Sequence, residues 1–156
     1  MANSQAMCSS FKRELLNGEH QFGSPTIVSR TSLTTPTADT FKLALFLATA
    51  SRGAADTVYN TTGELAGTGN YTQGGKTLTM IAPALDSTTA HTTPTATQTW
   101  TALTSSGAFD AAVLYNSTQS NKQVSVHTFS SQNVTAADFS LTMPTNNGTT
   151  GLIRIA

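Results

Sequence analysis

The feature that most constrains this chain is a series of short segments, from residue 40 to residue 155, in which apolar and polar residues alternate. The clearest are residues 40–47, 98–103, 109–115, 123–129 and 139–143. In the first of them Phe41, Leu43 and Leu45 fall on one face. A period of two is the geometry of a β-strand, because successive strand side chains point to opposite faces. The pattern therefore predicts a protein of several short strands.

Polar connections rich in Thr, Gly and Asn separate these segments, without a helical pattern between them. Thr makes up 30 of the 156 residues, and its branched Cβ packs well on a pleated surface. Residues 57–60 are expected to add a short strand, residues 86–97 a polar loop and residues 116–121 a hairpin connection. Many short strands without crossover helices are typical of an antiparallel β-sandwich or jelly roll. We therefore expect an all-β domain over residues 40–156.

The start of the chain contains one helical pattern, over residues 9–18. A serine can cap its first turn, Phe11 and Leu15 share an apolar face, and Glu14 is assigned to the wet side. About two turns are unstable in isolation, so this helix must dock on another element.

An irregular stretch follows over residues 19–39, with two prolines and many hydroxyls. Its large apolar residues are Ile27, Val28 and Leu33. A segment this long without regular structure is usually functional or a linker. We therefore assign residues 1–39 to a short helix and an extended N-terminal arm that precede the sandwich.

Charge is sparse and balanced, with 8 basic and 8 acidic residues and a formal net charge of zero. Proteins that neutralise nucleic-acid phosphates need a basic excess, so no nucleic-acid partner is expected. The longest apolar run, residues 43–48, is far shorter than the roughly 18 residues of a membrane span. The first ten residues do not have the pattern of a secretory leader. No membrane partner is expected.

The titratable residues do not form a catalytic or metal-binding motif. His20, His91 and His127 lie on separate segments without metal-ligand spacing, and His127 is interpreted as a residue on the wetter face of its strand. Cys8 is the single cysteine and cannot form an internal disulfide. The sequence also lacks the G-x-S-x-G motif of many serine hydrolases. We expect no enzymatic activity and no cofactor.

A neutral, hydroxyl-rich β chain is suited to short-range contacts, and exposed strand edges pair readily with other chains. The composition therefore favours an assembly protein over a solitary domain. Partner-binding residues are predicted on the helix face and the arm: Phe11, Leu15, Ile27, Val28 and Leu33. The alternative is that all five pack within the chain. A glycan-binding module that uses exposed Trp100, Tyr71 or Tyr115 is a hypothesis of a different class, with core packing as the alternative for Trp100.

Five blocks of the sequence resemble small structural proteins of tailed bacteriophages. They are SFKRELLNG at 10–18, TFKLALF at 40–46, ELAGTGNYTQGGKTL at 64–78, AVLYNS at 112–117 and GLIRIA at 151–156. The Thr/Pro-rich segments at 24–39 and 86–97 depart from the resemblance.

The resemblance implies a virion protein without active-site residues, made in the host cytoplasm. Its size favours a cement or decoration protein on the capsid surface. Such a protein binds across subunits of the major capsid protein and associates with itself as a dimer or trimer. A tail or neck protein is the alternative, because a fold-level resemblance does not fix the place in the particle.

Overall fold

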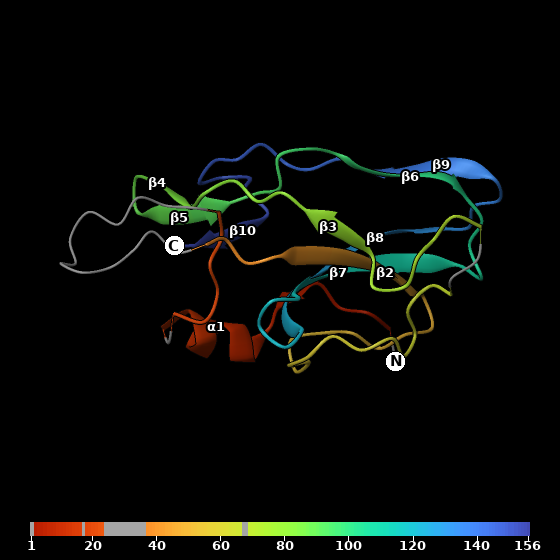
Figure 1. Cartoon of the computed structure of the whole chain (residues 1–156), viewed down its shortest axis with the longest axis horizontal. Helices are drawn as coiled ribbons and strands as arrows, with labels where there is room; N and C mark the ends of the chain where they lie inside the picture. The colour runs from red at the N-terminus through yellow and green to blue at the C-terminus, as the bar shows by residue number, and fades with distance from the viewer. Residues whose placement is uncertain (1, 17, 24–36, 67–68) are drawn as a thin grey trace.

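In the computed structural model, which describes residues 2–16, 18–23, 37–66 and 69–156, the alternating segments form antiparallel sheets (Figure 1). The strands are β1 (Ala6–Met7), β2 (Phe41–Leu47), β3 (Lys76–Leu78), β4 (Ala84–Asp86), β5 (Thr89–Thr92), β6 (Gln98–Leu103), β7 (Phe109–Asn116), β8 (Lys122–Gln132), β9 (Ala137–Leu141) and β10 (Ile153–Ile155). The helix in the described chain is α1 (Ser9–Leu16). The all-β, sandwich-like class predicted from the sequence is confirmed.

The main sheet has the strand order β1-β8-β7-β2-β3, and both of its faces are covered. One face carries Leu43 and Leu114, which belong to the same apolar cluster as Trp100 of β6. The opposite face carries Phe46 and Val113, against which Tyr59 packs. A strand that is buried on both faces has a nearly continuous apolar sequence. This explains why β2 and β7 have few polar residues.

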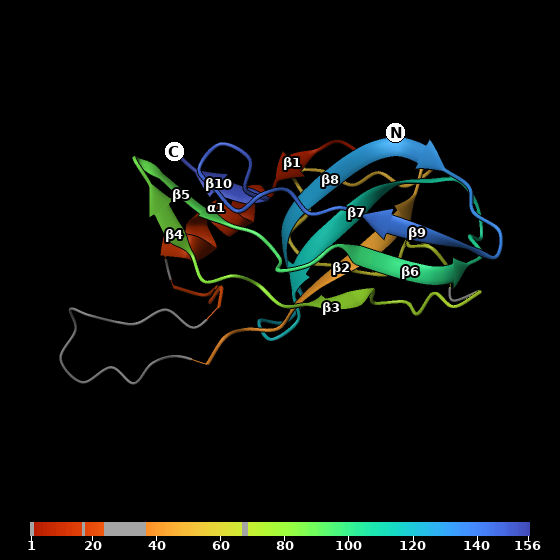
Figure 2. The same cartoon turned by 90° about the horizontal axis from the view of Figure 1, so that it is seen from above.

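Two smaller sheets complete the fold. β6 and β9 form a two-stranded layer over the main sheet, and β10-β5-β4 form a three-stranded sheet at one end (Figure 2). The sequence prediction of a loop over residues 86–97 is wrong, because β4 and β5 form a hairpin around the turn at Ser87 and Thr88. The two strands contain one large apolar side chain, Leu85, and therefore too little apolar alternation to be recognised. Conversely, residues 57–60 form only an isolated bridge at Val58.

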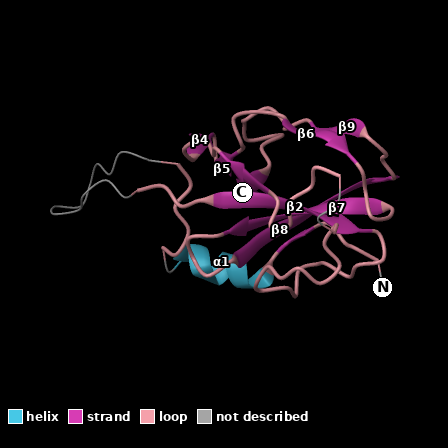
Figure 3. Cartoon of the chain, turned by 45° about the vertical axis from the view of Figure 1, so that its right-hand side comes forward, coloured by secondary structure: helices cyan, strands magenta, loops and turns pink. Residues whose placement is uncertain are grey.

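The helix begins at Ser9, as expected, and Gly18 follows it in the left-handed region with φ 70°. It lies on the side of the main sheet opposite β6 and β9 (Figure 3) and packs on β8. Glu14 is buried at 2% exposure, so its assignment to the wet side is wrong. Residues three apart share a helix face, so Glu14 follows Phe11 into the interior, where it hydrogen-bonds His20.

The described part of residues 1–39 belongs to the same core as residues 40–156. β1 adds a strand to the main sheet, and Phe22 stacks on Phe41 with ring centroids 4.3 Å apart. Residues 24–36 of the predicted arm lie outside the described residues. No helix in the described ranges is long and apolar enough to cross a membrane.

Candidate functional site

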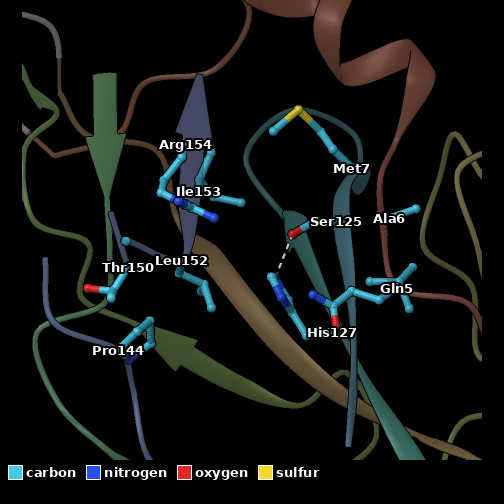
Figure 4. Close-up of a pocket in the computed structure, with 12 residues that line it drawn as sticks. Gln5, Ala6, Met7, Ser125, His127, Pro144, Thr150, Leu152, Ile153 and Arg154 are labelled. Carbon is cyan, nitrogen blue, oxygen red and sulfur yellow. Dashed lines mark hydrogen bonds between the residues drawn. The ribbon is translucent and has the colours of Figure 1, made fainter. Parts of the chain in front are cut away.

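An open cleft of about 450 Å³ lies between the main sheet and the three-stranded sheet. Its walls come from β1 and β10, and its floor comes from β8 (Figure 4). The lining residues are Gln5, Ala6, Met7, Ser125, Val126, His127, Pro144, Thr150, Gly151, Leu152, Ile153 and Arg154. β1 and β10 are terminal strands of their sheets. Each wall is therefore a strand edge that pairs with no further strand in the described chain.

The hydrogen-bond pattern shows which backbone groups of β1 face the cleft. The Cys8 N–H donates to the Val124 carbonyl at 3.0 Å, and Met7 is the register partner of Ser125. Hydrogen-bonded and non-bonded pairs alternate along an antiparallel ladder. The N–H and C=O of Met7 consequently point away from β8, at the free edge of the main sheet.

The same alternation locates the free groups of β10. The two-residue turn of the β4–β5 hairpin makes Asp86 and Thr89 a hydrogen-bonded pair. Ala90 therefore bonds toward β10, where its register partner is Ile155. Arg154, the next residue of β10, directs its N–H and C=O away from β5. The free edges of β1 and β10 thus offer one donor and one acceptor each, at Met7 and at Arg154, beside the cleft.

Ser125 and His127, two residues apart on β8, form the polar floor. Ser125 Oγ lies 2.8 Å from His127 Nε2. Burial lowers the pKa of His127 to about 4, so the ring is neutral at pH 7. His127 is half-buried and faces the open cleft, whereas Val126 on the other face of β8 is fully buried, so the assignment of His127 to the wetter face of its strand agrees with the structure. The imidazole lies opposite Ala112, whose side chain is in the apolar core, so it borders both the core and the cleft.

A serine bonded to a neutral histidine is also the nucleophile and general base with which a site for acyl transfer begins. Acyl transfer further requires a group that orients the imidazole and N–H donors for the oxyanion. The nearby Gly151 N–H already donates to the Asn147 carbonyl, and the Leu152 N–H donates to Thr93 Oγ1. In this arrangement Ser125 and His127 supply neutral hydrogen-bonding groups to whatever occupies the cleft.

A second polar cluster lies beside α1, at the ends of the segment assigned to the arm. Asp39 accepts hydrogen bonds from Asn116 Nδ2 at 2.7 Å and from the Gln21 N–H at 3.0 Å. The Asp39 N–H in turn donates to the Gln21 carbonyl at 3.1 Å. His20 bridges Asn116 and Glu14. Residues 21 and 39, on either side of the range that the structure does not describe, are therefore bonded to each other.

Lys122 completes this cluster from the start of β8. Its Nζ lies 3.1 Å from a carboxylate oxygen of Glu14 and 3.0 Å from one of Glu19. These two contacts raise the pKa of Lys122. They give the buried Glu14 a cationic partner at the surface, in addition to His20. The cluster anchors the N-terminal segment and has the character of a structural network.

The predicted partner-binding residues differ in how deeply the structure buries them and in whether they lie within the described residues. Phe11 is fully buried in the core of this chain. Leu15 is partly buried and lines an apolar hollow of about 100 Å³ between α1 and the three-stranded sheet. Ile27, Val28 and Leu33 lie outside the described residues. Phe11 is therefore satisfied within the chain, whereas Leu15 lies at the margin of a hollow.

The aromatic residues considered for glycan binding are all in the interior. Trp100, Tyr71 and Tyr115 are 2 to 4% exposed. Core packing, the alternative stated for Trp100, is confirmed. An exposed aromatic platform is not formed by these three side chains.

No protein-family model, curated protein or solved structure matches this chain. Within the described ranges, no group of three or more His, Cys, Asp or Glu residues could hold a metal ion. Sequence reasoning assigned no site role to Ser125, His127, Met7 or Arg154. The Ser-x-His spacing on a strand was a usable signal for the first two. The role of the other two depends on which strands end a sheet, and the sequence carries no direct signal for that.

Proposed function

We propose that this chain is a structural protein of a bacteriophage particle, specifically a cement protein that binds across major capsid protein subunits on the capsid surface. The observation that carries the proposal is the cleft between two unpaired strand edges, β1 and β10. The resemblance of the five sequence blocks supports the same assignment. The balanced charge agrees with a partner recognised through short-range contacts.

The mechanism follows from strand addition. An extended segment of a capsid subunit enters the cleft and hydrogen-bonds to the outward backbone groups of Met7 and Arg154. The neutral Ser125–His127 pair lies beneath it and needs no counter-charge. A protein that contacts more than one subunit gains avidity from the second contact. It then stabilises the assembled shell by mass action, because it binds that geometry and not the separated subunits.

The proposal is tested with particles that lack the protein. Purified protein is added to them, and binding is measured by co-sedimentation. Arg154→Pro removes the outward N–H from one cleft wall and should abolish binding. Arg154→Ala keeps that N–H and is the matched control, expected to bind nearly as wild type. Equal binding by both variants would contradict strand addition in the cleft.

The place in the particle is decided by stoichiometry. A cement protein is expected on the order of hundreds of copies per particle, distributed over a symmetric shell. A ring of about six or twelve copies would instead indicate the tail or neck. Quantitative mass spectrometry of purified particles measures this number directly. Absence of the protein from the particle would refute the proposed function.

A further inference from the structure

The three-stranded sheet has a second free edge at β4, on the far side of β5 from the cleft. All three residues of β4 are exposed, and Leu85 at its centre is 72% exposed. Soluble proteins usually protect such edges with charges, prolines or bulges. β4 follows Pro83 and ends in the charged Asp86, but its central residue is large, apolar and exposed, so the edge has the character of a contact surface at Leu85.

The backbone of Leu85 also faces outward. Asp86 and Thr89 close the two-residue turn as a hydrogen-bonded pair, so the next pair, Leu85 and Ala90, is non-bonded. The N–H and C=O of Leu85 therefore point away from β5. No strand of the described chain pairs with this side of β4. Leu85 thus presents both an apolar side chain and an unpaired donor and acceptor at one point.

Leu85 belongs to a row of apolar side chains that crosses the sheet. Ala90 is the register partner of both Leu85 and Ile155, and laterally paired residues share a sheet face. Ile155 is 46% exposed. Ala90 and Ile155 also line the apolar hollow beside α1. This apolar row (Leu85, Ala90 and Ile155) therefore borders the hollow beside α1 at Ala90 and Ile155, and it is most open at Leu85.

We propose that two copies of this chain associate through their β4 edges, antiparallel to each other, around a two-fold axis at Leu85. Each Leu85 then donates its N–H to the Leu85 carbonyl of the other copy. The two apolar rows meet at the axis, and the two sheets become one continuous sheet. This inference concerns a surface separate from the cleft and does not depend on the identity of the particle.

A second copy is the occupant because the edge is complementary to itself. Antiparallel pairing centred on Leu85 places Ala84 of one copy opposite Asp86 of the other, so no like charges face each other. The Asp86 carboxylate already accepts a hydrogen bond from the Gly148 N–H at 3.2 Å. Pro83 has no N–H at the next outward position, which confines the pairing to a short stretch. We therefore expect a concentration-dependent dimer.

The first test measures the mass of the isolated protein over a range of concentrations by sedimentation equilibrium. The wild type should convert from monomer to dimer as concentration rises. Leu85→Asp places two carboxylates opposite each other and should raise the dissociation constant at least about tenfold. Val58→Asp is the matched control, because Val58 is also an exposed large apolar residue, at 46% exposure, but lies away from β4. It should dimerise as wild type.

The second test uses the two-fold axis. If residue 85 faces itself, a mixture of the Leu85→Asp and Leu85→Lys variants should form a mixed dimer, although neither variant dimerises alone. A wild type that stays monomeric at all concentrations would overturn the proposal. So would dimers that Leu85→Asp leaves intact, or a mixture that does not associate. Loss of thermal stability in a monomeric Leu85→Asp variant would show that the row is covered within the chain. Particle binding is measured separately, so its failure would leave this result standing.

Discussion

Replacement of His127 by glutamine should remove a specific part of the pH dependence of folding stability. His127 lies on the floor of the cleft and bonds Ser125, and burial lowers its pKa to about 4 from an ordinary value of 6.5. As pH falls below 6.5, the unfolded chain binds the proton first. The histidine therefore favours unfolding progressively down to pH 4, where the loss is complete.

The size of the effect follows from the pKa difference. One pKa unit corresponds to about 1.4 kcal/mol, so the full shift would amount to about 3 kcal/mol. His127 is not completely shielded from water, which reduces the expected loss to about 2 kcal/mol. Glutamine retains a hydrogen-bonding group beside Ser125 but does not titrate in this range. The stability of His127→Gln relative to wild type should therefore increase by about 2 kcal/mol between pH 6.5 and pH 4.

Urea unfolding at several pH values measures this difference. Trp100 is the single tryptophan and is 3% exposed, so its fluorescence reports on the core. Other titrating groups contribute equally to both proteins and cancel in the comparison. Parallel stability curves for wild type and His127→Gln would refute the assignment of His127 to a desolvated site.

Four further substitutions test the packing. Gly75→Ala should lower the free energy of unfolding by more than about 3 kcal/mol or prevent folding, because the φ of Gly75 is 69° and an added Cβ would lie 2.0 Å from the Leu43 carbonyl oxygen. Gly18 has a φ of 70° but open space around it, so Gly18→Ala should lower the free energy of unfolding by about 1 kcal/mol in the same urea assay. Glu64→Gln should lower the free energy of unfolding, measured by thermal unfolding, by about 2 kcal/mol, because two tyrosine hydroxyls and a backbone N–H donate to this buried carboxylate. Phe11→Ala should cost about 3 to 5 kcal/mol, since the ring is fully buried; a loss below about 1 kcal/mol would show that Phe11 is not a core residue.

The strands that could be predicted are those in which apolar side chains dominate the pattern. β2 and β7 form at the expected positions, and the large residues Phe41, Leu43 and Phe109 are all in the core. The helix was also predictable, from its apolar spacing and the glycine at its end. In these segments the local pattern and the final packing agree, so local reasoning is sufficient.

The remainder could not be predicted because it depends on contacts between distant segments. Glu14 enters the core through bonds to His20 and Lys122, which lies 108 positions further along the chain. The β4–β5 hairpin has little apolar content and is recognised by its pairing rather than by its side chains. Alternation places His127 on the wetter face of β8 but does not reveal that its ring also borders the apolar core beside Ala112.

The two surfaces assigned to partners are connected through β5. This strand pairs with β10, whose free edge borders the cleft, and with β4, whose free edge carries Leu85. A partner strand at one edge is thus joined to a partner strand at the other through successive ladders of backbone hydrogen bonds. Those bonds run in the plane of the sheet, perpendicular to the strands. A load that separates the two partners would be shared among several bonds that must break together. Sparse charge suits this arrangement, because backbone pairing needs no ionic contact and is little affected by salt.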